Sequence, residues 1–403
     1  METIVLKFGG TSVGSTDRIS AVANLIHAAS SEAFPVVVVS AMSGETNRLI
    51  DLAQSFGAEP NKREFDALIS TGEKVSASLV AIALNHLGLK AKSLSAAQVG
   101  MKTTAQFSKA KILEMDNEII FQTIKDGYIP IVTGFQGITD TGDITTMGRG
   151  GSDTTAVAIA ASIKSKRCDI YTDVDGIYTT DPRIAPDAKK LDSICMEEML
   201  ELSGQGAKVI QIRAVEFANK YKVLVRVLSS FKPGSGTLIL HEENGMEDAV
   251  ITGIASQTDQ TKVTLHGVAD TPGIASGILS PISDAGIDVD VIVQNVSVSN
   301  KTDFTFTVAT HDRAEVETVL KEKMHGILYD ELIIEEAIGK VSLVGVGMRS
   351  HAGIASTAFN ALADAGINIQ MISTSEIKIT IVIAETQLEE AVRILHKAFH
   401  LGD

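Results

Sequence analysis

The last third of the chain contains one sequence pattern twice. The tetrapeptide GIAS occurs at residues 273–276 and again at 353–356, and DAGI occurs at 284–287 and again at 364–367. Each copy reads as strand, turn, helix, turn and strand, with further strand and helix sequence behind it. The pattern predicts a βαββαβ, ferredoxin-like unit that is present twice.

Upstream of the repeat, short β-branched runs alternate with amphipathic stretches. We expect strands at Ile4–Phe8, Val36–Ser40, Ile129–Thr133, Asp169–Thr172 and Val223–Leu228, and helices at Arg18–Ser30, Glu64–Leu87, Ala110–Lys125 and Thr154–Ser165. Strands separated by helices predict right-handed crossovers and a mostly parallel sheet. Pro, Gly and charged residues concentrate at 229–248, around a short strand TLIL, which indicates a domain boundary. We expect domains at 1–245, 258–336 and 337–403, with 246–257 as candidates to complete the second repeat.

Composition argues against several classes of protein. The net charge of −15 and the pI near 5.1 disfavour nucleic-acid binding, which needs clustered Lys and Arg. The two cysteines, Cys168 and Cys195, cannot form a disulfide framework or a CxxC metal knuckle. No apolar run reaches the ~20 residues that cross a bilayer. Because METIVLKFGG also lacks the features of a signal peptide, we expect a cytoplasmic protein with no membrane partner.

Two glycines follow the first predicted strand, in the segment KFGGTS at 7–12. Without a Cβ, Gly9 and Gly10 let backbone N–H groups approach an anion closely. Lys7 adds a full positive charge, and the start of the following helix adds a partial one. The segment is a candidate phosphate cradle, although it is not a Walker loop. The alternative is a tight turn with a solvated lysine.

A second glycine-rich segment, GRGGSDTTA at 148–156, runs into an Ala-rich helix. Arg149 offers a planar fork that matches a carboxylate, and open glycine amides suit an anion. A carboxylate beside these donors could orient them or hold Mg²⁺. The alternative is that Ser152 or Asp153 is only the helix N-cap. Because a cap needs neither an arginine nor three glycines, we favour a binding function.

Other polar turns lie at the ends of predicted elements. SAMSGETN at 40–47 and TGFQG at 133–137 follow strands, where open α/β sheets bind ligands. STGEK at 70–74 begins a helix, and the residues alone favour Glu73 as a first-turn carboxylate that interacts with the helix dipole. YTDVDGIY at 171–178 and DPR at 181–183 suit a loop with or without a function.

In this order, KFGGTS, SAMSGETN, STGE, GFQG, GRGGSDTTA, YTDVDGIYTTDPR and GAKV resemble the aspartate kinases of the amino acid kinase family. The tandem repeat resembles their two ACT domains, so the resemblance spans essentially the whole chain. It implies an α/β fold: a three-layer αβα kinase domain with a mostly parallel sheet, then two ferredoxin-like βαββαβ ACT domains. It also implies transfer of the ATP γ-phosphate to the side-chain carboxylate of L-aspartate, giving 4-phospho-L-aspartate and ADP. That step opens lysine, threonine, methionine and diaminopimelate biosynthesis.

The resemblance also implies residue roles. Its catalytic residues are Lys7 and Asp153, and its aspartate-binding residues are Thr46, Glu73, Arg149, Gly150, Gly151 and Ser152. Its nucleotide-binding residues are Lys7, Phe8, Gly9, Gly10, Ser40, Thr172, Asp173, Tyr178, Arg183, Lys208 and Val209. The implied cofactors are ATP and Mg²⁺, with no metal ligand assigned to the chain itself. Asn47 departs from the Asp of several relatives, with little effect expected because Thr46 is retained.

The implied reaction needs no strong general base, because the acceptor carboxylate is already ionised at pH 7. Catalysis can rest on in-line positioning and on neutralising charge in a loose transition state. That requires a lysine, backbone amides and Mg²⁺ at the phosphates, and a separate Arg and Glu on the amino acid.

Two roles for the repeats stay open. One is homo-oligomerisation through exposed sheet edges. The other, implied by the ACT resemblance, is feedback by lysine and/or threonine. The implied effector residues are Asp270, Ala275, Asp288, Val289, Asp290, Gln294, Ile354, Ala355, Asn368, Ile369, Ser375 and Glu376. Some relatives make the region that starts near Met246 as a separate regulatory subunit, which the resemblance allows here too.

Two rival functions also stay open. Another amino acid kinase, acting on acetylglutamate, glutamate, carbamate or a nucleotide, would share the GG phosphate loop. STGE, RGGSD and the tandem repeat favour the aspartate kinases. The second rival is a catalytically silent amino-acid-sensing ACT regulator, and the presence of Lys7, Glu73, Arg149 and Asp153 argues against it.

Overall fold

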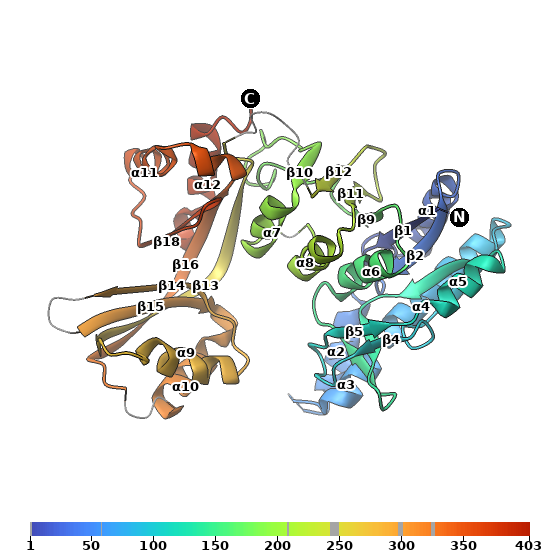
Figure 1. Cartoon of the computed structure of the whole chain (residues 1–403), viewed down its shortest axis with the longest axis horizontal. Coiled ribbons are helices and arrows are strands. Elements are labelled where there is room, and N and C mark those ends of the chain that lie inside the picture. Colours follow the sequence, from blue (N-terminus) through green and yellow to red (C-terminus); the bar gives the residue numbers. More distant parts are fainter. Residues whose placement is uncertain (1, 58, 208, 242–249, 297–300, 324–326) are drawn as a thin grey trace. The chain divides into compact units, whose positions relative to one another are not determined.

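The computed structural model describes residues 2–57, 59–207, 209–241, 250–296, 301–323 and 327–403 (Figure 1). Contacts divide the chain into two compact units. Unit 1 comprises Met1–Ile177, Lys190–Gly204 and Lys208–Gly245, and unit 2 comprises Tyr178–Lys189, Gln205–Ala207 and Met246–Asp403. Two predicted positions, Lys208 and Met246, lie outside the described residues.

Unit 1 is built on an eight-stranded sheet in the order β10–β12–β11–β9–β1–β2–β6–β3. Its strands are β1 (Thr3–Phe8), β2 (Phe34–Val39), β3 (Ala91–Leu94), β6 (Ile129–Thr133), β9 (Cys168–Thr172), β10 (Ser193–Cys195), β11 (Val225–Ser229) and β12 (Thr237–Leu240). All neighbouring pairs are parallel except β11 with β12. The Val run of β2 is buried throughout, as expected for a strand covered on both faces. The predicted mostly parallel sheet is confirmed.

Helices cover both faces of this sheet and complete a three-layer αβα arrangement. They are α1 (Thr16–Ala29), α2 (Glu45–Gln54), α3 (Lys62–Ile69), α4 (Thr71–His86), α5 (Glu118–Lys125), α6 (Gly151–Ser162), α7 (Met196–Gly204) and α8 (Ile212–Tyr221). Ile4, Leu6 and Phe8 of β1 pack in one core with α1 and α4. Helix α6 contacts β1, β2 and β9. Because side chains alternate along a strand, Lys7 points to the α6 face and Phe8 to the opposite one.

A second, small sheet follows the order β5–β4–β7–β8 and corrects one prediction. Its strands are β4 (Met101–Thr103), β5 (Ile112–Met115), β7 (Gln136–Ile138) and β8 (Ile144–Thr146). The prediction of one helix over Ala110–Lys125 is wrong, because β5 pairs with β4 and the helix begins only after it. There the Asp116 carboxylate accepts the N–H of Glu118 and starts α5.

The stretch predicted as one helix at Glu64–Leu87 is two helices, α3 and α4, with a break at Ser70. At the break, the Ser70 carbonyl accepts a hydrogen bond from Gln136 Nε2. Among the described residues, the span Lys62–His86 is long and apolar enough to cross a membrane by length and composition alone. Half of its most apolar window is buried inside the fold, and Val80 and Leu84 belong to the core below the sheet. Core helices pass the same length and composition test.

Unit 2 contains a six-stranded sheet in the order β14–β15–β13–β16–β18–β17. Its strands are β13 (Gly253–Ala269), β14 (Asp290–Val296), β15 (Lys301–Ala309), β16 (Glu331–Val344), β17 (Met371–Thr374) and β18 (Lys378–Ala384). Its α-helices are α9 (Ile274–Asp284), α10 (Arg313–Lys323), α11 (Ile354–Asp364) and α12 (Leu388–Ala398). Short 3₁₀ helices η1 (Thr310–Asp312), η2 (Val346–Ser350) and η3 (Glu385–Gln387) precede three of them.

The two repeats share the long strands β13 and β16, which run side by side in Figure 1. Residues 260–266 of β13 pair with 331–338 of β16 and close the first repeat. Residues 253–257 pair with 340–344 and supply the strand that the second repeat lacks in its own sequence. Gly273 and Gly353, which begin equivalent helices, both have φ +94°. The predicted pair of βαββαβ units is confirmed, while the boundaries at 245/258 and 336/337 stay a prediction.

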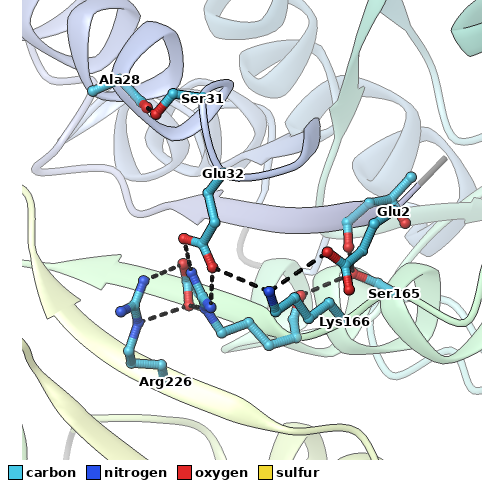
Figure 2. A network of polar contacts seen from close by, with 10 residues as sticks. Glu2, Ala28, Ser31, Glu32, Ser165, Lys166 and Arg226 are labelled. Atoms are coloured by element: carbon cyan, nitrogen blue, oxygen red, sulfur yellow. Dashed lines mark hydrogen bonds and ion pairs between the residues drawn. The ribbon is translucent and has the colours of Figure 1, made fainter.

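A cluster of ionic side chains lies at the amino end of β9, and Figure 2 shows Glu32, Lys166 and Arg226 among its members. Arg167 donates to both carboxylate oxygens of Glu32, at 2.7 and 2.6 Å, and through Nε to Asp169 at 2.7 Å. Arg226 donates two further hydrogen bonds to the buried Asp169. The hydrogen bonds from Arg167 lower the pKa of Glu32 to about 2. The cluster therefore ties β9, β11 and the start of β2 together.

Replacing Asp169 with alanine should destabilise unit 1 strongly. The change leaves the Arg167 and Arg226 guanidinium groups without their buried counter-charge, a loss of about 3 kcal/mol in the free energy of unfolding. Urea unfolding followed by circular dichroism measures it. Lys102→Ala, which removes only solvent-exposed ion pairs with Glu114 and Asp140, is the control. Equal stability losses in the two variants would contradict the structural role of the cluster.

Candidate active site

The carboxyl ends of β1, β2 and β6 and the start of α6 meet at one cavity of about 360 Å³ in unit 1. Carboxyl ends of parallel strands share one edge of a sheet, which is where open α/β folds bind ligands. The lining residues are Lys7, Gly9, Gly10, Ser40, Ala41, Met42, Ser43, Gly44, Thr46, Glu73, Phe135, Gly148, Arg149, Gly150, Gly151, Ser152 and Asp153. The two glycine-rich segments singled out in the sequence therefore line the same cavity.

Lys7 and Asp153 form an ion pair inside this cavity. Lys7 Nζ lies 2.6 Å from Asp153 Oδ1, and each side chain is only about a tenth exposed. Lys7 comes from β1 and Asp153 from the first turn of α6, so the pair joins the strand to the helix above it. A lysine paired with a buried carboxylate is not a merely solvated surface charge.

Helix α6 begins at the cavity wall with a glycine N-cap. Gly150 is the N-cap, with φ +71°, and Ser152 and Asp153 lie inside the helix. The alternative in which one of these two residues is the N-cap is therefore wrong. A Cβ at Gly150 would also lie 2.2 Å from Gln211 Cγ, so only glycine fits this position. The helix N-terminus places its partial positive charge at the cavity.

Glu73 is buried at the start of α4, with 3% of its surface exposed. Its Oε1 accepts the N–H of Ala41 at 3.1 Å, and no hydrogen-bond partner among the described residues reaches Oε2. Burial raises the pKa of Glu73 to about 7. A helix-dipole interaction alone does not explain a carboxylate held out of water in this way. Glu73 lines the cavity with one oxygen that no described group satisfies, and burying such a group without a partner is costly.

Arg149 also lines the cavity and is exposed. No carboxylate in the described part of the chain pairs with its guanidinium group, so the charge is available to a ligand. Thr46, in the first turn of α2, and Ser40, just after β2, also line the cavity. Asn47 is exposed and lies outside the lining.

The predicted nucleotide residues divide into two groups. Gly9 and Gly10 line the cavity, whereas Phe8 is fully buried and stacks on Tyr171 with ring centroids 4.7 Å apart. Thr172 ends β9 beside β1, and its carbonyl accepts the N–H of Ser230, whose hydroxyl contacts Ser12 Oγ. The carboxyl end of β9 thus lies next to the glycine turn after β1, but its residues are not part of the cavity lining.

Four more predicted positions are not among the lining residues. Asp173 follows Thr172 and its carboxylate accepts the Thr172 hydroxyl, and Val209 is half-buried in unit 1. Tyr178 and Arg183 belong to the segment Tyr178–Lys189, which is part of unit 2. The nucleotide roles of these positions, and that of Lys208, stay predictions.

Sequence reasoning did not select six of the lining residues. They are Ala41, Met42, Ser43, Gly44, Phe135 and Gly148. All six lie inside the turns at 40–47, 133–137 and 148–156, so the sequence predicts the turns but not their individual contacts. The sequence signal for these contacts is the glycine itself. In the structure a Cβ at Gly10 would lie 2.9 Å from the Ala41 carbonyl oxygen, so the two turns approach this closely because Gly10 has no side chain.

The predicted effector residues occupy related places in the two repeats of unit 2, near the helix starts and the outer strands. Asp270 follows β13, Ala275 lies in the first turn of α9, Asp288 and Val289 precede β14, and Asp290 and Gln294 lie in β14. Ile354 and Ala355 lie in the first turn of α11, Asn368 and Ile369 precede β17, and Ser375 and Glu376 follow β17. Strands β14 and β17 are the two outer strands of the sheet.

Asp290 pairs with a buried lysine, whereas Glu376, another effector candidate, pairs with the more exposed Arg349. The Asp290 carboxylate forms an ion pair with Lys340, whose side chain is fully buried. Burial would raise the pKa of Asp290, but the charge and hydrogen bond of Lys340 outweigh burial and hold it below its usual value. Asp270, by contrast, is exposed.

The donor set fits a metal that arrives with a nucleotide better than a metal held by the protein alone. Within the described ranges, no group of three or more His, Cys, Asp or Glu side chains is placed to bind a metal ion. The cavity offers the carboxylate of Asp153 beside its glycine turns. Mg²⁺ at phosphoryl-transfer sites commonly uses one or two carboxylates together with the substrate phosphates.

Comparisons with known proteins agree with this geometry. The model of the amino acid kinase family matches residues 2–229, and ACT domain models match 263–323 and 341–399. An aspartate kinase of Pseudomonas fluorescens is 55% identical over 100% of this chain and 98% of its own length. The crystal structure of E. coli aspartokinase III with aspartate and ADP is 26% identical, has a TM-score of 0.85 and covers 98% of this chain and 99% of its own. The same enzyme with lysine and aspartate has a TM-score of 0.75, covering 99% and 100% of the two chains at 26% identity.

The Glu73→Gln substitution should stabilise the protein, and more so at high pH. A raised pKa means that folding favours the protonated form, so the wild-type carboxylate costs stability as the pH rises from about 4.5 through 7. We expect the advantage of the Gln variant to grow by about 2 kcal/mol between pH 5.5 and pH 8.5. Chemical unfolding at both pH values measures it. Glu45→Gln is the control, because Arg48 lowers the pKa of Glu45 and keeps it ionised over this range. The same change of stability with pH in both variants would contradict the prediction.

Proposed function

The chain belongs to the amino acid kinase family, and on this basis we propose that its cavity binds L-aspartate and the phosphates of ATP. The enzyme transfers the γ-phosphate to the aspartate side-chain carboxylate, which gives 4-phospho-L-aspartate and ADP. The observation that carries the proposal is that Lys7, Asp153, Glu73 and Arg149 line one cavity. This is an aspartate kinase with two ACT domains, whose relatives match it from end to end.

Recognition of a free amino acid needs one protein group for its α-ammonium and another for its α-carboxylate. The Arg149 guanidinium suits the α-carboxylate because it offers a planar pair of donors. Glu73 suits the α-ammonium group because its Oε2 has no hydrogen-bond partner among the described residues. With Thr46 and Ser152 beside them, these groups leave the substrate's side-chain carboxylate to face the phosphate-binding side of the cavity.

Phosphoryl transfer then depends on position and charge. The acceptor carboxylate needs no deprotonation at pH 7, so no general base is required. Lys7 neutralises charge on the transferring group, and the turn at Gly9 and Gly10 lets backbone amides approach the phosphate. Asp153 holds the Lys7 ammonium in place through its ion pair. Mg²⁺ bound to the nucleotide, with Asp153 as its nearby carboxylate, would supply further neutralisation of phosphate charge.

Lys7→Ala and Arg149→Ala should separate turnover from substrate binding. Lys7→Ala should lower kcat by roughly 10³-fold with a much smaller change in aspartate KM, because Lys7 acts on charge in the transition state. Arg149→Ala should also raise aspartate KM, because it binds the ground state. Steady-state kinetics with a coupled ADP assay measures both. Lys92→Ala, an exposed lysine on β3, is the control, and near-normal kcat in Lys7→Ala would remove Lys7 from the mechanism.

Substrate choice is tested by the same assay with alternative acceptors. Acetylglutamate and glutamate are the rival substrates, since other amino acid kinases share the glycine turn. The ion-pairing partners at Glu73 and Arg149 favour a free α-ammonium group and so disfavour the acylated amino acid. Turnover with aspartate far above that with glutamate and acetylglutamate supports the proposal. The absence of ADP release with any acceptor would favour the non-catalytic sensing role instead.

For regulation, we propose that lysine, threonine or both bind at the equivalent turns of the two ACT domains. The lysine-bound E. coli structure supports an effector of this class. Helix-start amides at α9 and α11 suit an α-carboxylate, and the Asp270 carboxylate suits an ammonium group. An effector inhibits when it binds the less active arrangement more tightly. We also propose that the chain forms homo-oligomers through the outer strands β14 and β17. A separately made regulatory subunit and a cytoplasmic location are further parts of the proposal.

Asp270→Ala should weaken feedback without reducing uninhibited activity. Loss of a charge-assisted contact should raise the half-inhibitory concentration of lysine plus threonine by roughly ten-fold. Inhibition curves at fixed aspartate measure the effect. Asp284→Ala, at the far end of α9, is the matched control and should leave the curve unchanged. Identical inhibition curves for wild type and Asp270→Ala would remove Asp270 from the effector site.

A further inference from the structure

The loop that carries Arg149 is held by side chains from two other segments of unit 1, α3 and the start of α8. It leaves β8 at Thr146 and reaches the α6 cap at Gly150. Gly148 and Gly150 both have positive φ, at +74° and +71°. Because glycines leave a loop many backbone conformations, this loop needs outside contacts to hold one of them.

On one side, Asp66 of α3 binds the start of the loop. Asp66 is fully buried, and its two carboxylate oxygens accept four hydrogen bonds. The N–H and hydroxyl of Thr146 donate at 2.6 and 3.0 Å, and those of Ser108 donate at 2.8 and 3.0 Å. Ser108 itself has φ +65°. This carboxylate therefore organises backbone and does not face the cavity, whose lining does not include it.

On the other side, the start of α8 binds the next residues of the loop. Arg213 Nη1 donates to the carbonyl of Met147 at 2.7 Å, and Nη2 donates to the carbonyl of Ala110 at 3.0 Å. Gln211 Nε2 donates to the carbonyl of Arg149 at 3.2 Å. Met147 and Arg149 are thus each fixed by a side chain from more than 60 positions along the chain (213 − 147 = 66 and 211 − 149 = 62). The planar guanidinium fork spans two carbonyls, which a lysine ammonium cannot match.

We propose that Arg213 is a positioning residue for the substrate amino acid. Through the carbonyls of Met147 and Ala110 it fixes the loop from which the Arg149 guanidinium reaches the α-carboxylate. This inference rests on the proposed role of Arg149. Asp66 supports the same loop from the opposite side. A loop that is already ordered loses little conformational entropy when it binds a ligand. Removing the contacts that order it should therefore weaken aspartate binding selectively.

The test is the Arg213→Lys variant of the full chain, assayed for both substrates. Lysine keeps the charge but loses the fork, so aspartate KM should rise roughly ten-fold or more while ATP KM changes less than about two-fold. Arg226→Lys is the matched control, because Arg226 also makes a two-nitrogen contact from a partly buried position, to Asp169 at the other end of the sheet. A purely structural role for Arg213 predicts the same kinetics for both variants.

Two further variants keep the inference open to refutation. If Arg213→Lys yields little folded protein, Gln211→Met removes the donor to the Arg149 carbonyl together with the acceptor of the Ile212 N–H at the start of α8, and aspartate KM should rise about two- to five-fold. Wild-type aspartate KM in Arg213→Lys, beside a raised KM in Arg149→Ala, would overturn the positioning role and leave the proposed function intact. Wild-type KM in both variants would overturn the role of Arg149 and this inference with it.

Discussion

The ion pair between Lys7 and Asp153 is the contact around which the catalytic unit is organised. Both side chains are largely withdrawn from water, so each charge would be costly without the other. The pair connects the carboxyl end of β1 to the first turn of α6 and brings their two glycine turns to one cavity. Removing two charges from water adds little to stability by itself, so the pair is best explained by the chemistry it serves.

Around that pair, the charged groups of the cavity divide by partner. Lys7 is already matched by a protein carboxylate, whereas Arg149 and one oxygen of Glu73 have no matching group within the described residues. The unmatched groups are those that an amino acid with both an α-ammonium and an α-carboxylate would satisfy. A net charge of −15 does not oppose phosphate binding, because the cationic groups act locally.

Unit 2 solves a different physical problem. Each repeat needs a fourth strand, and the second repeat obtains it from residues 253–257 of β13, which lie 83 to 91 positions before their partners at 340–344 (340 − 257 and 344 − 253). Since β13 and β16 run through both repeats, the two ACT domains form one continuous sheet and share its hydrogen bonds. The outer strands β14 and β17 then remain at its two edges, next to the predicted effector turns.

Much of this could be read from the sequence because it is local or periodic. The duplication, the alternation of strands and helices, and the glycine turns each have short-range signatures, and the ordered motifs indicated the family. The errors occurred where tertiary contacts overrode a local pattern. Strand β5 replaced part of a predicted helix because β4 lies beside it, and Ser70 interrupts a helix where Gln136 binds its carbonyl.

The sequence by itself determined the fold class, the repeat and the candidate residues, because periodicity and glycine placement act over a few positions. Only the tertiary structure decided that Lys7 meets Asp153, that Glu73 is buried, and that Arg213 and Asp66 hold the loop before α6. Those contacts join residues from about 40 to 150 positions apart. Burial and ion pairing depend on which segments the folded sheet brings together, and no local pattern encodes that.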